Sequence, residues 1–158
     1  MENTYVDIMI QSLQKKKKVL EEIKKQNILQ KNILEEDVAD AERFDKTVED
    51  KASLIEQITQ LDSGFDKLFE RVKDALNENR DAYAEDIKMM QQLIREVTDL
   101  SMEVQAQEAR NKDLMTRKFV SIRERAKVVR TNSKAANQYY QNMMQLNVID
   151  PQFMDNKK

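Results

Sequence analysis

The stretch that decides the fold is YAEDIKMMQQLIREVTDLSMEV, residues 83–104. Its apolar side chains recur at intervals that alternate between three and four residues, at Tyr83, Ile87, Met90, Ile94, Val97, Leu100 (or Ser101) and Val104. Because a helix has about 3.6 residues per turn, this spacing places them in one stripe along one side. No Gly or Pro interrupts the stretch. It predicts a long amphipathic helix that packs on other helices by coiled-coil contacts.

The rest of the chain has the same character. Its 158 residues include one Gly and one Pro, and charged residues make up 35%. Long helices that expose most of their circumference have such a composition. Because a helix rises about 1.5 Å per residue, a helix of about 60 residues would span about 90 Å, so the helices must fold back on one another or dimerise. We expect an all-α fold: one elongated antiparallel hairpin or bundle of about three long helices with coiled-coil packing.

Few residues in the sequence mark where these helices begin and end. We expect a first helix over 4–36, a second over 38–62, a third over 65–146 and a flexible tail over 147–158. The first boundary depends on capping by Asp37 or Asp40, and the last on Pro151, since the residue before a proline disfavours helix. Gly64 either ends the second helix or is a weak spot inside one continuous helix. The polar stretch 105–113 is a candidate hinge in the third helix.

Polar residues occupy inward positions of the first predicted helix, at Lys16, Asn27 and Gln30. Polar layers of this kind cost stability but can fix the register of the helices. The alternative is that neighbouring helices cover the first helix only in part, so that Lys16 reaches solvent. Further along, Arg110 and Asn111 belong either to a buried hydrogen-bonded layer, to a bend or to a solvated segment.

The composition disfavours most enzymes. The chain has no His and no Cys, which removes the commonest general base, thiolate nucleophiles and the usual metal ligands. The net charge of −2 gives no basic footprint for nucleic acid, and no apolar run approaches the length of a membrane span. The start has neither a basic region nor an apolar core of a signal peptide. We therefore expect a cytoplasmic protein without catalytic residues, cofactor, metal, nucleic-acid partner or membrane insertion.

Charge is segregated along the chain. Residues 35–62 carry ten acids and three basic residues, a net of −7, whereas residues 117–134 carry seven basic residues and one acid, a net of +6. Such segregation indicates either pairing between helices in an antiparallel fold or a basic face reserved for a partner. The tetralysine at 15–18 is instead typical of a solvated helix surface, since four consecutive residues point to different sides.

The apolar stripe near the C-terminus combines small residues with Tyr and Met side chains. Such adaptable faces suit the binding of a helix. The stripe either packs on the protein's own first two helices or binds a foreign helix. The candidate partner-binding residues are Phe119, Ile122, Ala126, Val129, Ala136, Tyr139, Tyr140, Met143 and Met144.

The order of these features resembles the FlgN family of flagellar type III export chaperones. The resemblance rests on Phe44 followed by VEDKASLIEQITQL (48–61), on EARNKDL (108–114), on YYQNMM (139–144) and on FMDNKK (153–158). It implies an α-helical cytoplasmic chaperone that binds terminal helices of the hook-associated proteins of the hook–filament junction through its C-terminal region. The excess of Arg and Lys over 117–134 is a departure from this resemblance.

Two rivals follow from the pattern itself. A structural coiled-coil protein would use the same stripes to self-associate into a stable high-order oligomer, whereas the chaperone is expected to be a monomer or a weak or helix-exchanged dimer. An enzyme restricted to carboxylates, Tyr and Lys would need a concave pocket, which long stripes with few loops rarely build.

Overall fold

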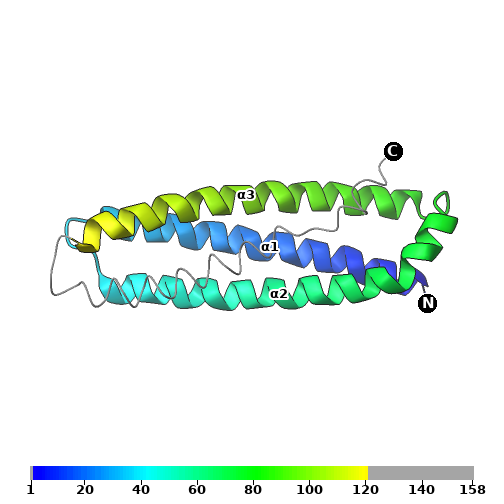
Figure 1. The fold of residues 1–158 in the computed structure, drawn as a ribbon, viewed down its shortest axis with the longest axis horizontal. Coiled ribbons are helices and arrows are strands. Elements are labelled where there is room, and N and C mark those ends of the chain that lie inside the picture. Colours follow the sequence, from blue (N-terminus) through cyan, green and yellow to red (C-terminus); the bar gives the residue numbers. More distant parts are fainter. Residues whose placement is uncertain (1, 121–158) are drawn as a thin grey trace.

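A computed structural model describes residues 2–120 as three long helices laid side by side (Figure 1). They are α1 (Glu2–Glu35), α2 (Ala41–Glu78) and α3 (Ala84–Val120). Successive helices run in opposite directions, which gives an elongated antiparallel bundle. The all-α fold of three long helices expected from the sequence is confirmed. The part of the third predicted helix beyond residue 120 and the tail 147–158 lie outside the described residues.

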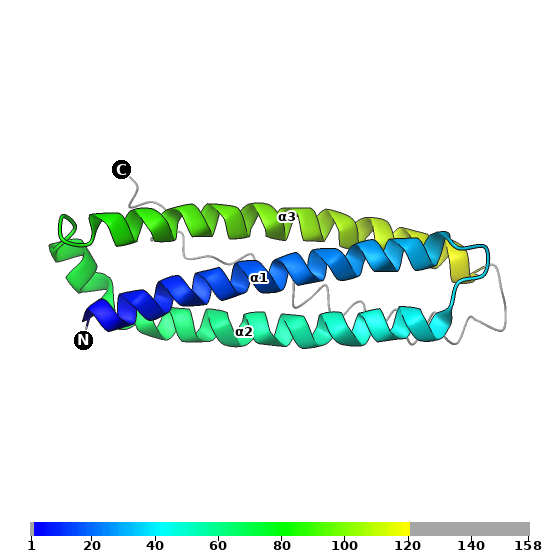
Figure 2. The ribbon, with the colours of Figure 1, turned by 180° about the vertical axis from the view of Figure 1, so that it is seen from behind.

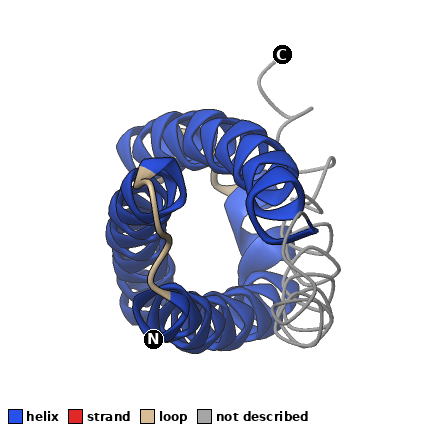
Figure 3. Ribbon diagram, turned by 90° about the vertical axis from the view of Figure 1, so that its left-hand side faces the viewer, coloured by secondary structure: helices blue, strands red, loops and turns tan. Residues whose placement is uncertain are grey.

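The middle position belongs to α1. Both α2 and α3 pack along it, whereas α2 and α3 approach each other closely at few points. Figures 1 and 2 show α1 between the other two helices from opposite sides. The connection 36–40 and the end of α3 lie at one end of the bundle, and the start of α1 and the 79–83 connection lie at the other. Figure 3 views the bundle end-on, with the 36–40 connection nearest the viewer.

The first connection, residues 36–40, ends in a capping aspartate. The Asp40 carboxylate accepts hydrogen bonds from the backbone N–H groups of Glu42 (3.0 Å) and Arg43 (3.2 Å). These two donors would otherwise lack a partner in the first turn of α2. Asp40 itself is extended, with φ −82° and ψ 106°. A capping side chain therefore starts a helix where the sequence contains neither Gly nor Pro.

The expected boundary between a second helix ending at 62 and a third beginning at 65 is wrong. α2 continues through Gly64 to Glu78, and no described residue has a positive φ. The apolar stripe explains this, because Ile58 and Phe69 on either side of the glycine are both buried. Packing of the stripe outweighs the roughly 1 kcal/mol that a helical glycine costs.

The second connection lies instead at residues 79–83, in the polar stretch that follows Leu76. Asn79 leaves the helical conformation at φ −123° and ψ 41°, and its side-chain Nδ2 donates to the carbonyl oxygen of Ala75 at 3.0 Å. The hinge considered for 105–113 is also absent from the described chain, since α3 runs unbroken from Ala84 to Val120. Two polar residues of that stretch, Glu108 and Asn111, are buried in the interior.

Replacing Gly64 by Ala is expected to stabilise the protein by about 0.5–1 kcal/mol, because alanine loses less backbone entropy in a helix. A Cβ atom at this position meets nothing within 4 Å, so the methyl group enters without a clash. Thermal unfolding followed by circular dichroism measures the change. A lower melting temperature would mean that α2 needs the glycine for a bend at this point.

Candidate functional site

The interior of the bundle is divided into three apolar clusters along its length. The first lies at the end that holds the start of α1, the second in the middle, and the third near the 36–40 connection. The buried members of the first cluster are Val6, Met9, Ile10, Leu13, Phe69, Val72, Leu76, Met90, Leu93 and Ile94. Those of the second are Leu20, Ile23, Ile55, Ile58, Val97 and Val104. Those of the third are Ile33, Leu34, Ala39, Phe44, Val48 and Met115.

An ion pair separates the first cluster from the second. Lys16 Nζ lies 2.7 Å from Asp62 Oδ1, and the two side chains are 5% and 30% exposed. Burial raises the pKa of the Asp62 carboxyl above its usual value, although Lys16 opposes this rise. Lys16 therefore does not reach solvent through an uncovered side of α1, and the inward polar position predicted from its heptad register is confirmed.

A larger polar layer separates the second cluster from the third, and all three helices contribute to it. Lys51 Nζ of α2 donates to Asn27 Oδ1 (2.8 Å) and Gln30 Oε1 (2.8 Å) of α1 and to Glu108 Oε1 (2.6 Å) of α3. Asn111 Nδ2 of α3 donates to the Asn27 carbonyl (2.9 Å) and to Gln30 Oε1 (3.2 Å). All five residues are buried. We call this set the central polar layer.

Sequence reasoning identified only part of this layer. Asn27 and Gln30 were recognised as inward, and the buried option for Asn111 is correct. Lys51 and Glu108 were missed, although the signal was available: Lys51 lies at helical spacing between the core residues Val48 and Ile55. A charged residue in a core register on one helix implies a partner of opposite charge on another, because a buried charge is costly unless it is paired.

The ammonium of Lys51 lies deep inside the protein. Burial lowers its pKa, and the neighbouring carboxylate of Glu108 partly offsets that effect. A lysine with a lowered pKa can serve as a base or nucleophile where a substrate can reach it. Here Nζ donates to three acceptors within the layer, and the side chain is 4% exposed. We interpret the layer as a structural device that fixes the axial register of the helices.

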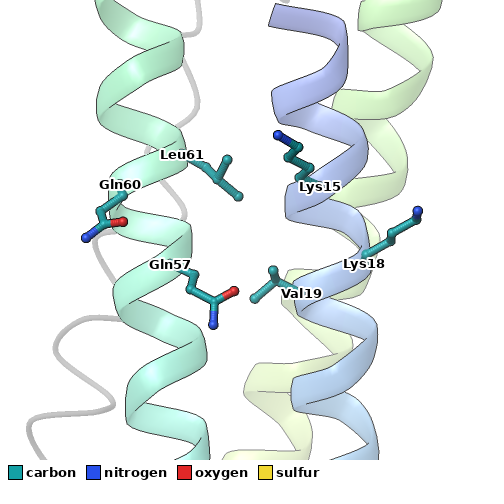
Figure 4. Close-up of a pocket in the computed structure, with 6 residues that line it drawn as sticks. All are labelled: Lys15, Lys18, Val19, Gln57, Gln60 and Leu61. Atoms are coloured by element: carbon teal, nitrogen blue, oxygen red, sulfur yellow. The ribbon is translucent and has the colours of Figure 1, made fainter. Parts of the chain in front are cut away.

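An open pocket of about 420 Å³ lies between α1 and α2 (Figure 4). Val19 and Leu61 point into the space between the helices, whereas Lys18 points away. The pocket contains no His or Cys and no carboxylate; its lining residues are Lys15, Lys18, Val19, Gln57, Gln60 and Leu61. Within residues 2–120, no group of acidic, His or Cys side chains is arranged to hold a metal ion.

Exposed apolar residues on the described bundle are scattered. Val38 in the first connection is 70% exposed, and Met102 and Met89 on α3 are 63% and 50% exposed. Single apolar residues on a surface are ordinary and mark no binding site. Among residues 4–118, the large apolar side chains therefore face the interior for the most part, and a long partner-binding stripe has to be sought elsewhere in the chain.

The predicted partner-binding stripe begins where the described bundle ends. The backbone of Phe119 belongs to the last turn of α3, and the eight candidates from Ile122 to Met144 lie outside the described residues. One neighbour of the stripe is placed: Lys118 Nζ donates to the carbonyl oxygens of Glu36 and Asp37 in the first connection. The first residues of the basic segment thus lie beside the start of the acidic segment.

The fold and its polar layers define a class of protein: an antiparallel helical bundle of coiled-coil type whose described part contains no metal cluster, and in which no described helix is long and apolar enough to cross a membrane. The sequence matches the family described as FlgN protein over residues 1–147, and the chain belongs to that family. FlgN proteins are flagellar export chaperones. No curated protein and no solved structure matches the chain.

Proposed function

We propose that this protein is a cytoplasmic chaperone for hook-associated proteins, the subunits of the hook–filament junction, and that it binds their terminal amphipathic helices before type III export. Such a helix exposes a large apolar face that promotes premature assembly, and a chaperone prevents this by covering the face. The covering needs neither a catalytic residue nor a cofactor. The proposed contact surface is the stripe from Phe119 to Met144.

The observation that carries the proposal is the position of this stripe. The residues described in the three apolar clusters all lie within residues 2–120, and the family match continues beyond them to residue 147. The stripe after Val120 thus belongs to the region that the family match covers, and in the sequence it follows the three described helices. Its small, Tyr and Met side chains form the adaptable apolar surface that helix binding requires.

Ending the chain after Val120 is expected to leave a folded bundle that no longer binds its cargo. The truncated chain keeps all three clusters, the central polar layer and the contact of Lys118 with the first connection. Co-purification of the full-length and shortened chains with the hook-associated proteins of the same bacterium tests this expectation. Undiminished binding by the shortened chain would refute the assignment of the stripe.

The rival is a structural coiled-coil protein that self-associates through the same stripe. Solution mass separates the two. A monomer or weak dimer that forms a defined complex with a hook-associated protein supports the chaperone. A stable high-order oligomer that binds no such protein contradicts it.

A further inference from the structure

One long side of the bundle is not closed by a helix of the described chain. The flank of α3 that faces α1 is occupied, since Glu96 and Glu103 pair with Lys17 and Lys24 of α1. Glu108 points to α2. By helical spacing of about 100° per residue, the flank of α3 turned away from α1 carries Gln91, Thr98, Gln105 and Lys112.

The corresponding flank of α2 follows from the same reasoning. Gln57 and Leu61 line the pocket against α1, so the flank that faces away from α1 lies on the other side of the inward residue Lys51. It carries a series at seven-residue spacing: Asp45, Ala52, Thr59, Asp66 and Lys73. We call the two series together the α2–α3 face. No helix within residues 2–120 covers this face, because α2 and α3 approach each other closely at few points.

Charge distinguishes the two flanks of the α2–α3 face. The positions four residues after Asp45, Ala52 and Asp66 lie next to the α2 series and carry Glu49, Glu56 and Glu70. This side of the face is therefore acidic. The α3 series is uncharged apart from Lys112, and the residues that flank it at the same spacing include Lys88 and Arg95. Within the described chain, two buried polar atoms of α3 beside this face have no hydrogen-bond partner: Ser101 Oγ and Gln105 Nε2. Buried polar groups without partners are uncommon in native proteins. A basic amphipathic helix would match this combination of features.

The chain itself supplies such a segment, in the right place and direction. Lys118 lies against Glu36 and Asp37, so the chain leaves α3 beside the start of α2. A helix that turned back there would run parallel to α2, and residues 121–147 would extend about 40 Å, within the roughly 57 Å of the 38-residue α2. Its basic half, up to residue 134, would lie beside the acidic first half of α2.

We propose that residues 121–144 dock as a fourth helix on the α2–α3 face of their own chain when no cargo is bound. Docking buries the apolar stripe, and opposite charges hold it in place. If the proposed function is correct, cargo and bundle compete for one stripe, so the free chaperone masks the surface with which it binds. This explains how an exposed apolar stripe avoids aggregation before cargo arrives.

Crosslinking of cysteines tests the docking directly, because the natural chain contains none. If the fourth helix begins within a few residues of Val120, Ala136 comes within about a turn of Ala52. The full-length variant Ala52→Cys/Ala136→Cys, treated with a short bismaleimide, is expected to form a crosslink within one chain. The matched control is Ser53→Cys/Ala136→Cys, since Ser53 is also exposed but lies about 100° further around α2, on the side that faces away from the interior of the bundle.

We expect the Ala52 variant to react about tenfold faster than the Ser53 control, because docking raises the local concentration of the second thiol around the first. Equal rates in the two variants would overturn the docking. Crosslinks between chains that increase with protein concentration would also overturn it, in favour of a second copy as the occupant. Circular dichroism establishes that both variants fold.

Adding a purified hook-associated protein separates this proposal from the proposed function. Loss of the Ala52 crosslink on cargo binding supports both. If cargo binds and the crosslink persists, competition for the stripe is refuted while the chaperone function stands. If the crosslink forms but no hook-associated protein binds, the proposed function fails and the docking remains supported.

Discussion

Replacing Glu108 by Gln is expected to destabilise the bundle by about 3 kcal/mol. Glu108 and Lys51 are 3% and 4% exposed, and their charged atoms lie 2.6 Å apart. Removing one partner of a buried pair leaves the other charge without compensation, which typically costs about 3–5 kcal/mol. Glutamine keeps an acceptor of the same shape, so we expect the lower end of that range. Urea unfolding at neutral pH measures the loss.

The matched control for this variant is Glu103→Gln. Glu103 also lies on α3 and pairs with a lysine, Lys24, at 2.7 Å, but the two side chains are 52% and 40% exposed. Exposed pairs contribute at most about 1 kcal/mol. Similar losses in the two variants would mean that the central polar layer contributes no more than a surface ion pair, which would contradict our interpretation.

The Glu108→Gln variant also has an expected pH signature. Burial holds the pKa of Lys51 below its usual 10.5, and Glu108 opposes that shift, so its removal lowers the pKa of Lys51 further. A folded-state pKa below the unfolded one means that the unfolded chain binds more protons in between, and stability then rises with pH. From neutrality to about pH 10, the stability of the variant should therefore rise more steeply than that of the natural protein. Parallel pH profiles would contradict this.

The long stripes made most of the fold predictable. Where apolar residues recur at alternating intervals of three and four residues, as from Tyr83 to Val104, the pattern predicts a helix with one buried side. The inward polar residues of α1 were predictable for the same reason, since Asn27 and Gln30 interrupt a regular register. The register of one helix does not give the axial position of the residues on a neighbouring helix. For that reason the ion pair between Lys51 and Glu108 could not be predicted from the sequence.

The wrong boundary at Gly64 and the wrong hinge at 105–113 were both predicted from local residue preferences, which the packing of the helices overrides. Gly64 is the strongest helix breaker in the first 150 residues, yet the stripe continues past it and the helix does too. The true turn at 79–83 contains neither Gly nor Pro, and Asn79 ends α2 with its own side chain. The stretch 105–113 looked like a hinge because it is polar. Two of its residues, Glu108 and Asn111, are polar because they belong to the central polar layer.

Replacing Tyr140 and Met143 together by Asp is expected to weaken cargo binding about 100-fold or more. Both residues belong to the predicted partner-binding stripe, at helical spacing. A carboxylate in an apolar contact must lose its water without gaining a partner, and two of them cost about 3 kcal/mol or more at an interface. Titration of the full-length variant with a purified hook-associated protein measures the affinity.

A matched variant, Gln138→Asp/Gln145→Asp, adds the same two charges seven residues apart. At helical spacing these positions fall opposite the stripe, so cargo binding should be nearly unchanged. Comparison of the two variants therefore separates a contact surface from a general effect of charge on the C-terminal segment. Both variants should keep a folded three-helix bundle, because the residues described in its three apolar clusters all precede residue 121. If the Tyr140/Met143 variant instead lost its fold, the stripe would be part of the core, and the cargo would have to bind elsewhere.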